Sequence, residues 1–147
     1  MPGERIAAAA DGPQIAEAVL KAALINAAMV GSGGFIGAIC RYGMSGFVQR
    51  KAALAAFPYG TLAVNMLGCL LIGLIAGLVE SRQLFGPDFR RFVLIGILGG
   101  FTTYSTFGYE TFAMLRDAEF FRAAGNVVIH VVLGLALVMA GYGLVTR

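Results

Sequence analysis

The sequence predicts an all-α membrane protein with four transmembrane helices, and three observations lead to this prediction. Of the 147 residues, 59% are hydrophobic and 13% are charged, whereas soluble domains carry about 25% charged residues. The mean hydropathy is +0.81. The apolar residues form long unbroken runs, which favour helices over the alternating strands of a membrane barrel. A water-soluble globule is therefore excluded.

Four apolar blocks, separated by short charged turns, define the expected elements. A membrane span needs about 20 predominantly apolar residues, and each block is long enough. The expected helices lie near 24–48, 57–80, 92–115 and 124–145. Together they form a transmembrane domain over 22–147. The N-terminal tail over 1–21 lacks the compact basic, apolar and cleavage regions of a signal peptide.

Three glycine pairs at four-residue spacing predict close contacts between helices. They are Gly33 with Gly37, Gly73 with Gly77, and Gly96 with Gly100. Small residues at this spacing let helix backbones approach closely in lipid. Cys40 and Cys69 lie inside apolar runs, where we expect them to pack as small hydrophobic residues.

The Lys and Arg residues, which normally fix the orientation of a membrane protein, are nearly balanced between the two sides. One side carries Arg5, Lys21, Arg82, Arg90, Arg91 and Arg147, and the other carries Arg50, Lys51, Arg116 and Arg122. This weak bias permits insertion in both orientations, and thereby an antiparallel, dual-topology homodimer. A single orientation set by the modest bias is the alternative. Because these cations are scattered between apolar blocks, they are expected to contact lipid headgroups and not nucleic acid.

The third block contains a stretch that is poorly suited to a regular membrane helix. Gly99 and Gly100 are followed by four Ser or Thr residues within positions 102–106. This pattern predicts a third helix broken at mid-membrane, because irregular backbone at that depth is tolerated only beside protein or a water-filled cavity. Freed carbonyls at such a break suit a hard cation such as Na⁺. The alternative is that the hydroxyls bond back to the preceding turn and bend the helix.

An aromatic stripe runs through the same stretch. Phe101, Tyr104 and Phe107 recur every three residues and therefore share one helical face. Ring edges carry the positive part of the aromatic quadrupole, so edges that line a narrow path can attract an anion weakly. Weak sites suit conduction, which requires that the ion also leaves. Simple packing is the alternative.

Four further polar residues lie within the apolar blocks. The Asn65 amide is expected either to donate to an anion on a pathway or to form an interhelical hydrogen bond. Arg41 is expected to attract anions into a vestibule or to pair structurally. His130 is expected to be a hydrogen-bonded packing residue, and Glu110 to pair with a Lys or Arg near the membrane edge.

Several groups that catalysis or coupled transport would need are missing from the sequence. The first, second and fourth blocks contain no carboxylate at membrane depth, and the chain has no HExxH motif and no Cys–His cluster. Proton-coupled antiport and intramembrane hydrolysis therefore lack their usual groups. We expect passive conduction and not an enzyme.

Three segments resemble the Fluc/CrcB family of fluoride channels: Gly33–Tyr42, Gly60–Gly68 and Gly99–Phe107. With the four-span layout, the likeness covers residues 24 to 145. The resemblance implies antiparallel dual-topology homodimers with two fluoride pores and a structural Na⁺ at the dimer centre. It also implies passive export of fluoride across the cytoplasmic (inner) membrane of a prokaryote, which relieves fluoride toxicity.

The resemblance further implies a role for each matching residue. Asn65 is the fluoride donor on the second helix, and Tyr104 and Phe107 occupy the paired pore-phenylalanine positions, where Tyr104 departs from the usual Phe. Ser105 and Thr106 supply hydroxyls near the path, and His130 takes the place of a hydroxyl donor on the fourth helix. The remaining assignments are Arg41 in the vestibule, Na⁺ on the carbonyls of Gly99 and Thr102, and Glu110 at the acidic position after the second aromatic ring.

Two other functions stay open on the sequence alone. A small multidrug-type, proton-coupled antiporter shares the four spans and the dual topology, but it requires a carboxylate on the first helix. A non-transporting membrane assembly subunit fits the glycine faces, but it leaves the hydroxyl and aromatic cluster unexplained.

Overall fold

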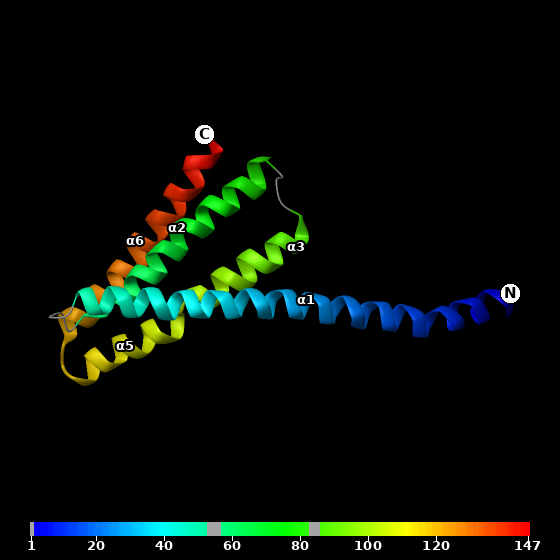
Figure 1. Cartoon of the computed structure of the whole chain (residues 1–147), viewed down its shortest axis with the longest axis horizontal. Helices are drawn as coiled ribbons and strands as arrows, with labels where there is room; N and C mark the ends of the chain where they lie inside the picture. Colours follow the sequence, from blue (N-terminus) through cyan, green and yellow to red (C-terminus); the bar gives the residue numbers. More distant parts are fainter. Residues whose placement is uncertain (1, 53–56, 83–85) are drawn as a thin grey trace.

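A computed structural model describes the backbone of residues 2–52, 57–82 and 86–147, and the side chains of 12–52, 57–81 and 86–147. Every regular element in these ranges is a helix (Figure 1). The elements are α1 (Pro2–Lys51), α2 (Tyr59–Arg82), α3 (Pro87–Phe89), the π-helical η1 (Arg90–Leu98), α4 (Gly99–Phe101), α5 (Tyr104–Arg116) and α6 (Phe120–Thr146).

Four helical stretches in the described ranges are long and apolar enough to cross a membrane. They are Gly12–Lys51, Tyr59–Ser81, Pro87–Arg116 and Phe120–Thr146. Their outer surfaces are apolar, as contact with lipid requires; on α6, for example, Val132 is 63% and Leu135 is 61% exposed. The expected all-α protein with four membrane-spanning helices is thereby confirmed.

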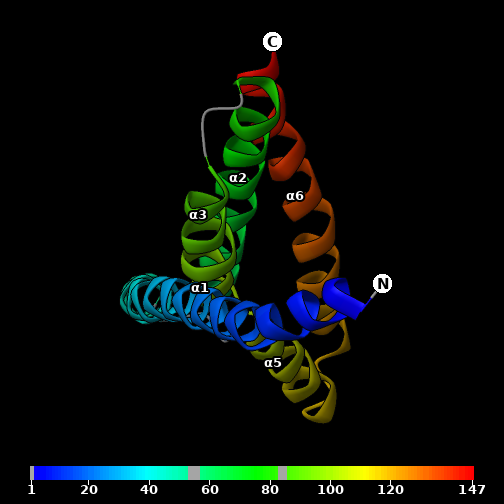
Figure 2. The ribbon, with the colours of Figure 1, turned by 90° about the vertical axis from the view of Figure 1, so that its right-hand side faces the viewer.

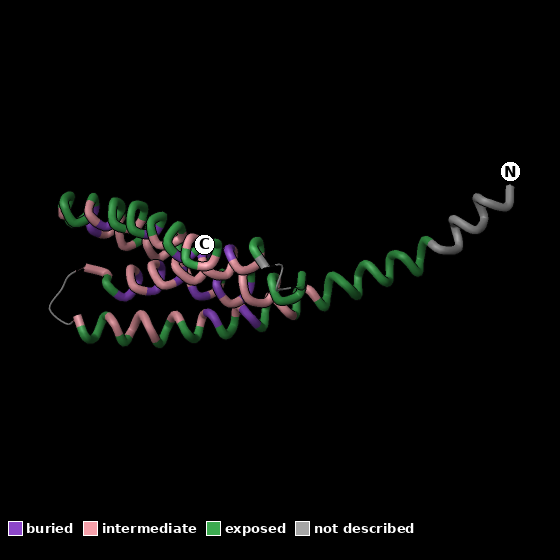
Figure 3. The backbone as a smooth tube through the Cα atoms, turned by 90° about the horizontal axis from the view of Figure 1, so that it is seen from above, coloured by how far each residue is buried: buried purple, intermediate pink, exposed green. Residues whose placement is uncertain are grey.

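The first helix is longer than expected, because it begins at Pro2 and not near residue 24. Its 50 residues extend over about 75 Å, more than twice the thickness of a bilayer's hydrocarbon core. Its N-terminal part runs past the other helices, and there the described side chains are exposed (Figure 3). The segment expected as a separate tail is therefore continuous with α1 from residue 2.

The helices pack as two groups that meet along the C-terminal half of α1. α2 lies along α6, while α1 crosses η1 and α4 (Figures 1 and 2). Glycines make both contacts possible: a Cβ built on Gly37 would overlap the Ile97 carbonyl oxygen, and one on Gly73 would overlap the Val138 carbonyl oxygen. The other paired glycines are also in close contact with a neighbouring helix: Gly33, Gly77, Gly96 and Gly100. The predicted close approach at all three pairs is confirmed.

Hydrogen bonds stabilise the connections at the ends of α1 and α5. Gln49 joins α1 to α2, because its Nε2 donates to the Phe57 carbonyl (3.2 Å) and its Oε1 accepts from Gly60 N–H (3.0 Å). α5 ends in a left-handed turn at Ala118 (φ 62°), beside which Glu119 N–H donates to the Met114 carbonyl (2.8 Å). This is the position of a helix C-terminus at which glycine is usually found.

Candidate functional site

Between α4 and α5 the chain leaves the helical conformation for two residues. Thr102 (φ −83°, ψ 157°) and Thr103 (φ −147°, ψ 114°) are extended. Thr103 N–H would pair with the Gly99 carbonyl in a regular helix, but it donates to Asn65 Oδ1 (3.0 Å). Thr106 N–H would pair with the Thr102 carbonyl, but it donates to Thr103 Oγ1 (3.2 Å). The carbonyls of Gly99 and Thr102 thus lose their helical donors.

Both polar atoms of the Asn65 side chain on α2 form hydrogen bonds with the backbone of this interruption. Its Oδ1 accepts from Thr103 N–H, and its Nδ2 donates to the Thr103 carbonyl (3.2 Å). Both residues are buried, where an unpaired backbone group is costly. The interhelical hydrogen bond expected of Asn65 is therefore present, and one of its two amide hydrogens is left for another acceptor.

The hydroxyl groups after the interruption bond mainly to one another and to the backbone. Thr103 is the N-cap of α5, because its Oγ1 accepts from Thr106 N–H. The same oxygen donates to Thr106 Oγ1 (2.9 Å) and lies 3.3 Å from Ser105 Oγ. Thr102 bonds back to the preceding turn, with Oγ1 donating to the Leu98 carbonyl (3.0 Å). The bonding back to the preceding turn, which was the alternative expected for these hydroxyls, thus occurs at Thr102.

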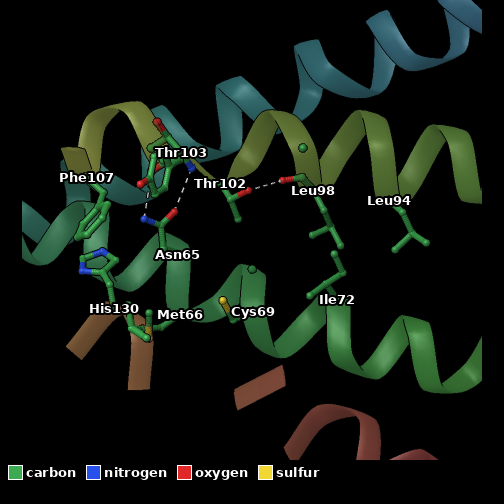
Figure 4. Close-up of a pocket in the computed structure, with 14 residues that line it drawn as sticks. Asn65, Met66, Cys69, Ile72, Leu94, Leu98, Thr102, Thr103, Phe107 and His130 are labelled. Atoms are coloured by element: carbon green, nitrogen blue, oxygen red, sulfur yellow. Dashed lines mark hydrogen bonds between the residues drawn. The ribbon is translucent and has the colours of Figure 1, made fainter. Parts of the chain in front are cut away.

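A cavity of about 410 Å³ lies beside the interruption, between α2, α6 and the third span (Figure 4). It brings together six of the expected site residues: Asn65, Gly99, Thr102, Tyr104, Phe107 and His130. Most of the remaining wall is apolar, including Ile72, Leu94 and Leu98. The other four expected residues do not line it: Arg41, Ser105, Thr106 and Glu110.

Three rings follow one another along one end of the cavity. The Tyr104 and Phe107 ring centroids are 5.7 Å apart, and those of Phe107 and His130 are 4.4 Å apart. Tyr104 is 84% exposed, and its hydroxyl has no hydrogen-bond partner in the part of the chain that the structure describes. Phe101, the third member of the sequence stripe, is buried and does not line the cavity.

His130 has a fixed ring orientation. Its Nδ1 lies 2.9 Å from the Asn126 carbonyl oxygen, which only accepts, so Nδ1 carries the hydrogen. In the neutral ring Nε2 therefore presents a lone pair, and this buried atom has no partner among the described residues. The hydrogen-bonded histidine expected from the sequence is present.

Glu110 does not make the expected pair with a Lys or Arg in the described part of the chain. Its Oε1 accepts from the Thr61 hydroxyl on α2 (2.6 Å). The prediction was wrong because α5 packs on α2 through a face that presents Thr61 and no cation. The Arg41 side chain on α1 makes no ion pair or hydrogen bond with another described residue, and the residue is half-buried.

Three further polar residues support the site, and the sequence analysis assigned no role to them. Thr103 supplies the cap and the backbone groups held by Asn65. Thr61 bonds Glu110, and the fully buried Asn126 donates from Nδ2 to Thr111 Oγ1 (2.8 Å). Only Thr103 could have been found from the sequence. A Ser or Thr N-cap accepts from the backbone N–H two or three residues later, and Thr106 lies three residues after Thr103.

A comparison with known families decides the affiliation of the chain. The profile of the CrcB-like proteins, described as "Camphor Resistance (CrcB)", matches residues 28–142. The chain belongs to the CrcB family. Its CrcB relatives include proteins named "Fluoride-specific ion channel FluC" from Geobacter sulfurreducens and Methylobacillus flagellatus.

These two relatives cover most of the chain. The Geobacter protein is 48% identical over 108 residues, which is 74% of this chain and 86% of the relative. The Methylobacillus protein is 42% identical over 117 residues, which is 80% of this chain and 91% of the relative. A third FluC, from Nitratidesulfovibrio vulgaris DP4, is 42% identical over 116 residues, 79% of this chain and 93% of the relative.

Proposed function

We propose that this protein is a fluoride-selective channel that exports fluoride passively across the cytoplasmic membrane of a prokaryote and so relieves fluoride toxicity. The observation that carries the proposal is the cavity in which Asn65, Tyr104, Phe107 and His130 meet beside an interrupted helix. Membership of a family whose relatives are named for fluoride conduction supports it.

A fluoride ion in the cavity would meet dipoles and no fixed charge. The free amide hydrogen of Asn65 and the ring edges of Tyr104 and Phe107 are its donors, and His130 forms the adjoining wall. Fluoride is small and strongly hydrated, so a narrow site that replaces its water with a few donors disfavours larger halides. Arg41, without an ionic partner among the described residues, attracts anions electrostatically towards the site, and Ser105 and Thr106 contribute hydroxyls near the path.

The same interruption, which we place at mid-membrane, fits a structural Na⁺ ion. The carbonyls of Gly99 and Thr102 have lost their helical donors, and carbonyl oxygens are the ligands that hard cations prefer. One chain supplies two such oxygens, whereas hard cations usually take about six or more ligands. A second, antiparallel copy related by a two-fold axis would raise the set to four oxygens, which supports the dual-topology homodimer suggested by the balanced Lys and Arg residues.

The function is tested by fluoride efflux from liposomes that contain the purified protein. Vesicles loaded with potassium fluoride are diluted into fluoride-free buffer, and valinomycin releases potassium to drive anion exit, which a fluoride electrode records. We expect rapid fluoride exit and little exit from matched vesicles that hold potassium chloride. Flux that requires a proton gradient would instead indicate an antiporter, and no flux in either arm would indicate an assembly subunit.

The arrangement of the copies is tested separately by labelling. A cysteine introduced at Arg147, in a Cys40→Ser, Cys69→Ser background, is exposed to a membrane-impermeant maleimide on intact cells. Dual topology predicts labelling of about half of the chains from outside, because the copies insert equally in the two orientations. Labelling of all or none of the chains would contradict it.

A further inference from the structure

A second cavity, of about 380 Å³, lies where the third span begins. Its wall combines two cations with apolar side chains, and the residues that line it are Pro87, Arg90, Arg91, Leu94 and Ile95. Of these residues only Leu94 also lines the larger cavity, where it lies at the opposite end from Phe107 (Figure 4). The second cavity is therefore separate from the proposed fluoride path.

The winding of η1 places apolar side chains directly beside the cations. Hydrogen bonds in a π-helix join residues five positions apart, so Ile95 follows Arg90 on the same face. In an α-helix the same two side chains would point about 140° apart. Ile95 is 61% exposed, and Leu94 is half-buried next to it. The cavity thus has a cationic end and an apolar end, one helical turn apart.

The cationic end lies at the edge of the membrane. The interruption at Thr102, which we place at mid-membrane, begins a dozen residues after Arg90. At no more than about 1.5 Å per residue, this separation is at most about 18 Å, which is close to half of a hydrocarbon core about 30 Å thick. Arg90 and Arg91 therefore lie at the depth of the lipid headgroups, and Leu94 and Ile95 lie beside the acyl chains.

One of the two arginines has no partner within the chain. Arg91 Nη1 pairs with Asp88 Oδ1 (2.7 Å), whereas Arg90 is exposed and makes no ion pair or hydrogen bond with the residues that the structure describes. Two arginines and one aspartate leave a net charge of +1, which a single phosphodiester of charge −1 neutralises. Guanidinium groups also match the geometry of phosphate oxygens, to which they donate two parallel hydrogen bonds.

We infer that this cavity is a binding site for one anionic phospholipid, such as phosphatidylglycerol. Arg90 and Arg91 bind the phosphate, and an acyl chain lies along Leu94 and Ile95. A zwitterionic lipid carries its own cation beside the phosphate, so it gains less from the positive charge of the site. A free phosphate gains nothing from the apolar end, because it brings no apolar surface to bury.

Native mass spectrometry of the full chain in detergent tests this inference, because it counts bound lipids and gives their affinity. We expect one saturable phosphatidylglycerol per chain, with phosphatidylcholine bound at least about 5-fold more weakly and no saturable binding of glycerol phosphate. Arg90→Gln should weaken the binding of phosphatidylglycerol by about 5-fold, since each Lys or Arg beside anionic lipid contributes about that factor.

Two further variants separate the site from general effects of charge and folding. Arg50→Gln is the matched control, because Arg50 is exposed on α1, lies on the other side of the membrane and lines neither cavity; it should bind as the parent does. Asp88→Asn raises the net charge at the cavity to +2 and releases Arg91 from its ion pair. It should therefore strengthen binding by about 5-fold, an effect that damage to the fold would not produce.

Several results would overturn the inference, and none of them depends on fluoride conduction. Binding that survives Arg90→Gln, that falls equally in Arg50→Gln, or that does not strengthen in Asp88→Asn would contradict the role of the two arginines. Equal affinity for phosphatidylcholine would reduce the cavity to a non-specific lipid contact. Saturable binding of glycerol phosphate that Arg90→Gln removes would make it a site for free phosphate and not for a lipid.

Discussion

The hydrogen bonds between Asn65 and Thr103 lead to a specific prediction about stability. Replacing Asn65 with Leu keeps a side chain of similar size but leaves the Thr103 N–H and carbonyl without partners in a buried environment. Each buried backbone group that loses its partner costs about 1–3 kcal/mol. The Asn65→Leu variant should therefore unfold with a free energy lower by about 2–6 kcal/mol.

The assay is equilibrium unfolding in detergent, followed by far-ultraviolet circular dichroism because the chain contains no tryptophan. Met66→Leu is the matched control, since it changes the next residue of α2 at nearly constant volume and should cost less than about 1.5 kcal/mol. A loss below about 0.5 kcal/mol in Asn65→Leu, within the scatter of neutral substitutions, would refute the bonding that holds the interruption.

The aspartate variant separates the structural role of Asn65 from its role towards fluoride. Asn65→Asp keeps the acceptor for Thr103 N–H, but it loses the donor and adds a negative charge that repels an anion by about 4 kcal/mol at 4 Å and an effective dielectric of 20. Fluoride efflux should fall by more than about 100-fold. Unchanged efflux in a folded Asn65→Asp protein would remove Asn65 from the path.

Three further substitutions test other parts of the structure by the same unfolding assay. Gly37→Ala should destabilise the protein by about 1–3 kcal/mol through overpacking, whereas Gly43→Ala on the same helix, with nothing within 4 Å, should be neutral or stabilising by up to about 1 kcal/mol; equal effects would contradict the close helix contact. Thr61→Val should cost about 1–3 kcal/mol because Glu110 loses its hydrogen bond, and Thr61→Ser should restore most of it; a harmless Thr61→Val would show that the bond is not formed. Ala118→Gly should stabilise the protein by about 0.5–1 kcal/mol, because φ is 62° there; a destabilised variant would rule out the left-handed turn.

The sequence was most informative where a pattern has one physical solution. Long apolar runs have to form helices in lipid, so the four spans were predicted well, and the glycine pairs located the contacts of α1 with η1 and of α2 with α6. The hydroxyl cluster after Gly100 was expected to disturb the third helix, and the backbone leaves the helical conformation at Thr102 and Thr103. These features depend on local composition and spacing.

Features that depend on which helix faces which were not predictable. Glu110 was expected to find a cation, but the packing of α5 against α2 offers the Thr61 hydroxyl. The contact of Cys69 and Met66 with the Gly134 backbone depends on the rotation of α2 relative to α6, which no single-helix pattern specifies. The sequence analysis did not predict that α1 begins at Pro2. The first residues of α1 are charged and rich in alanine, so they show neither the apolar run of a membrane span nor the apolar face of a packed helix.

The central claim is most directly tested by the reversal potential of the protein in a planar bilayer, with both anions on both sides but fluoride in excess on one side and chloride in excess on the other. A passive fluoride-selective channel predicts a reversal potential at the fluoride equilibrium value, unchanged when a proton gradient is imposed. A reversal potential near the chloride value, or one that follows the proton gradient, would contradict the account.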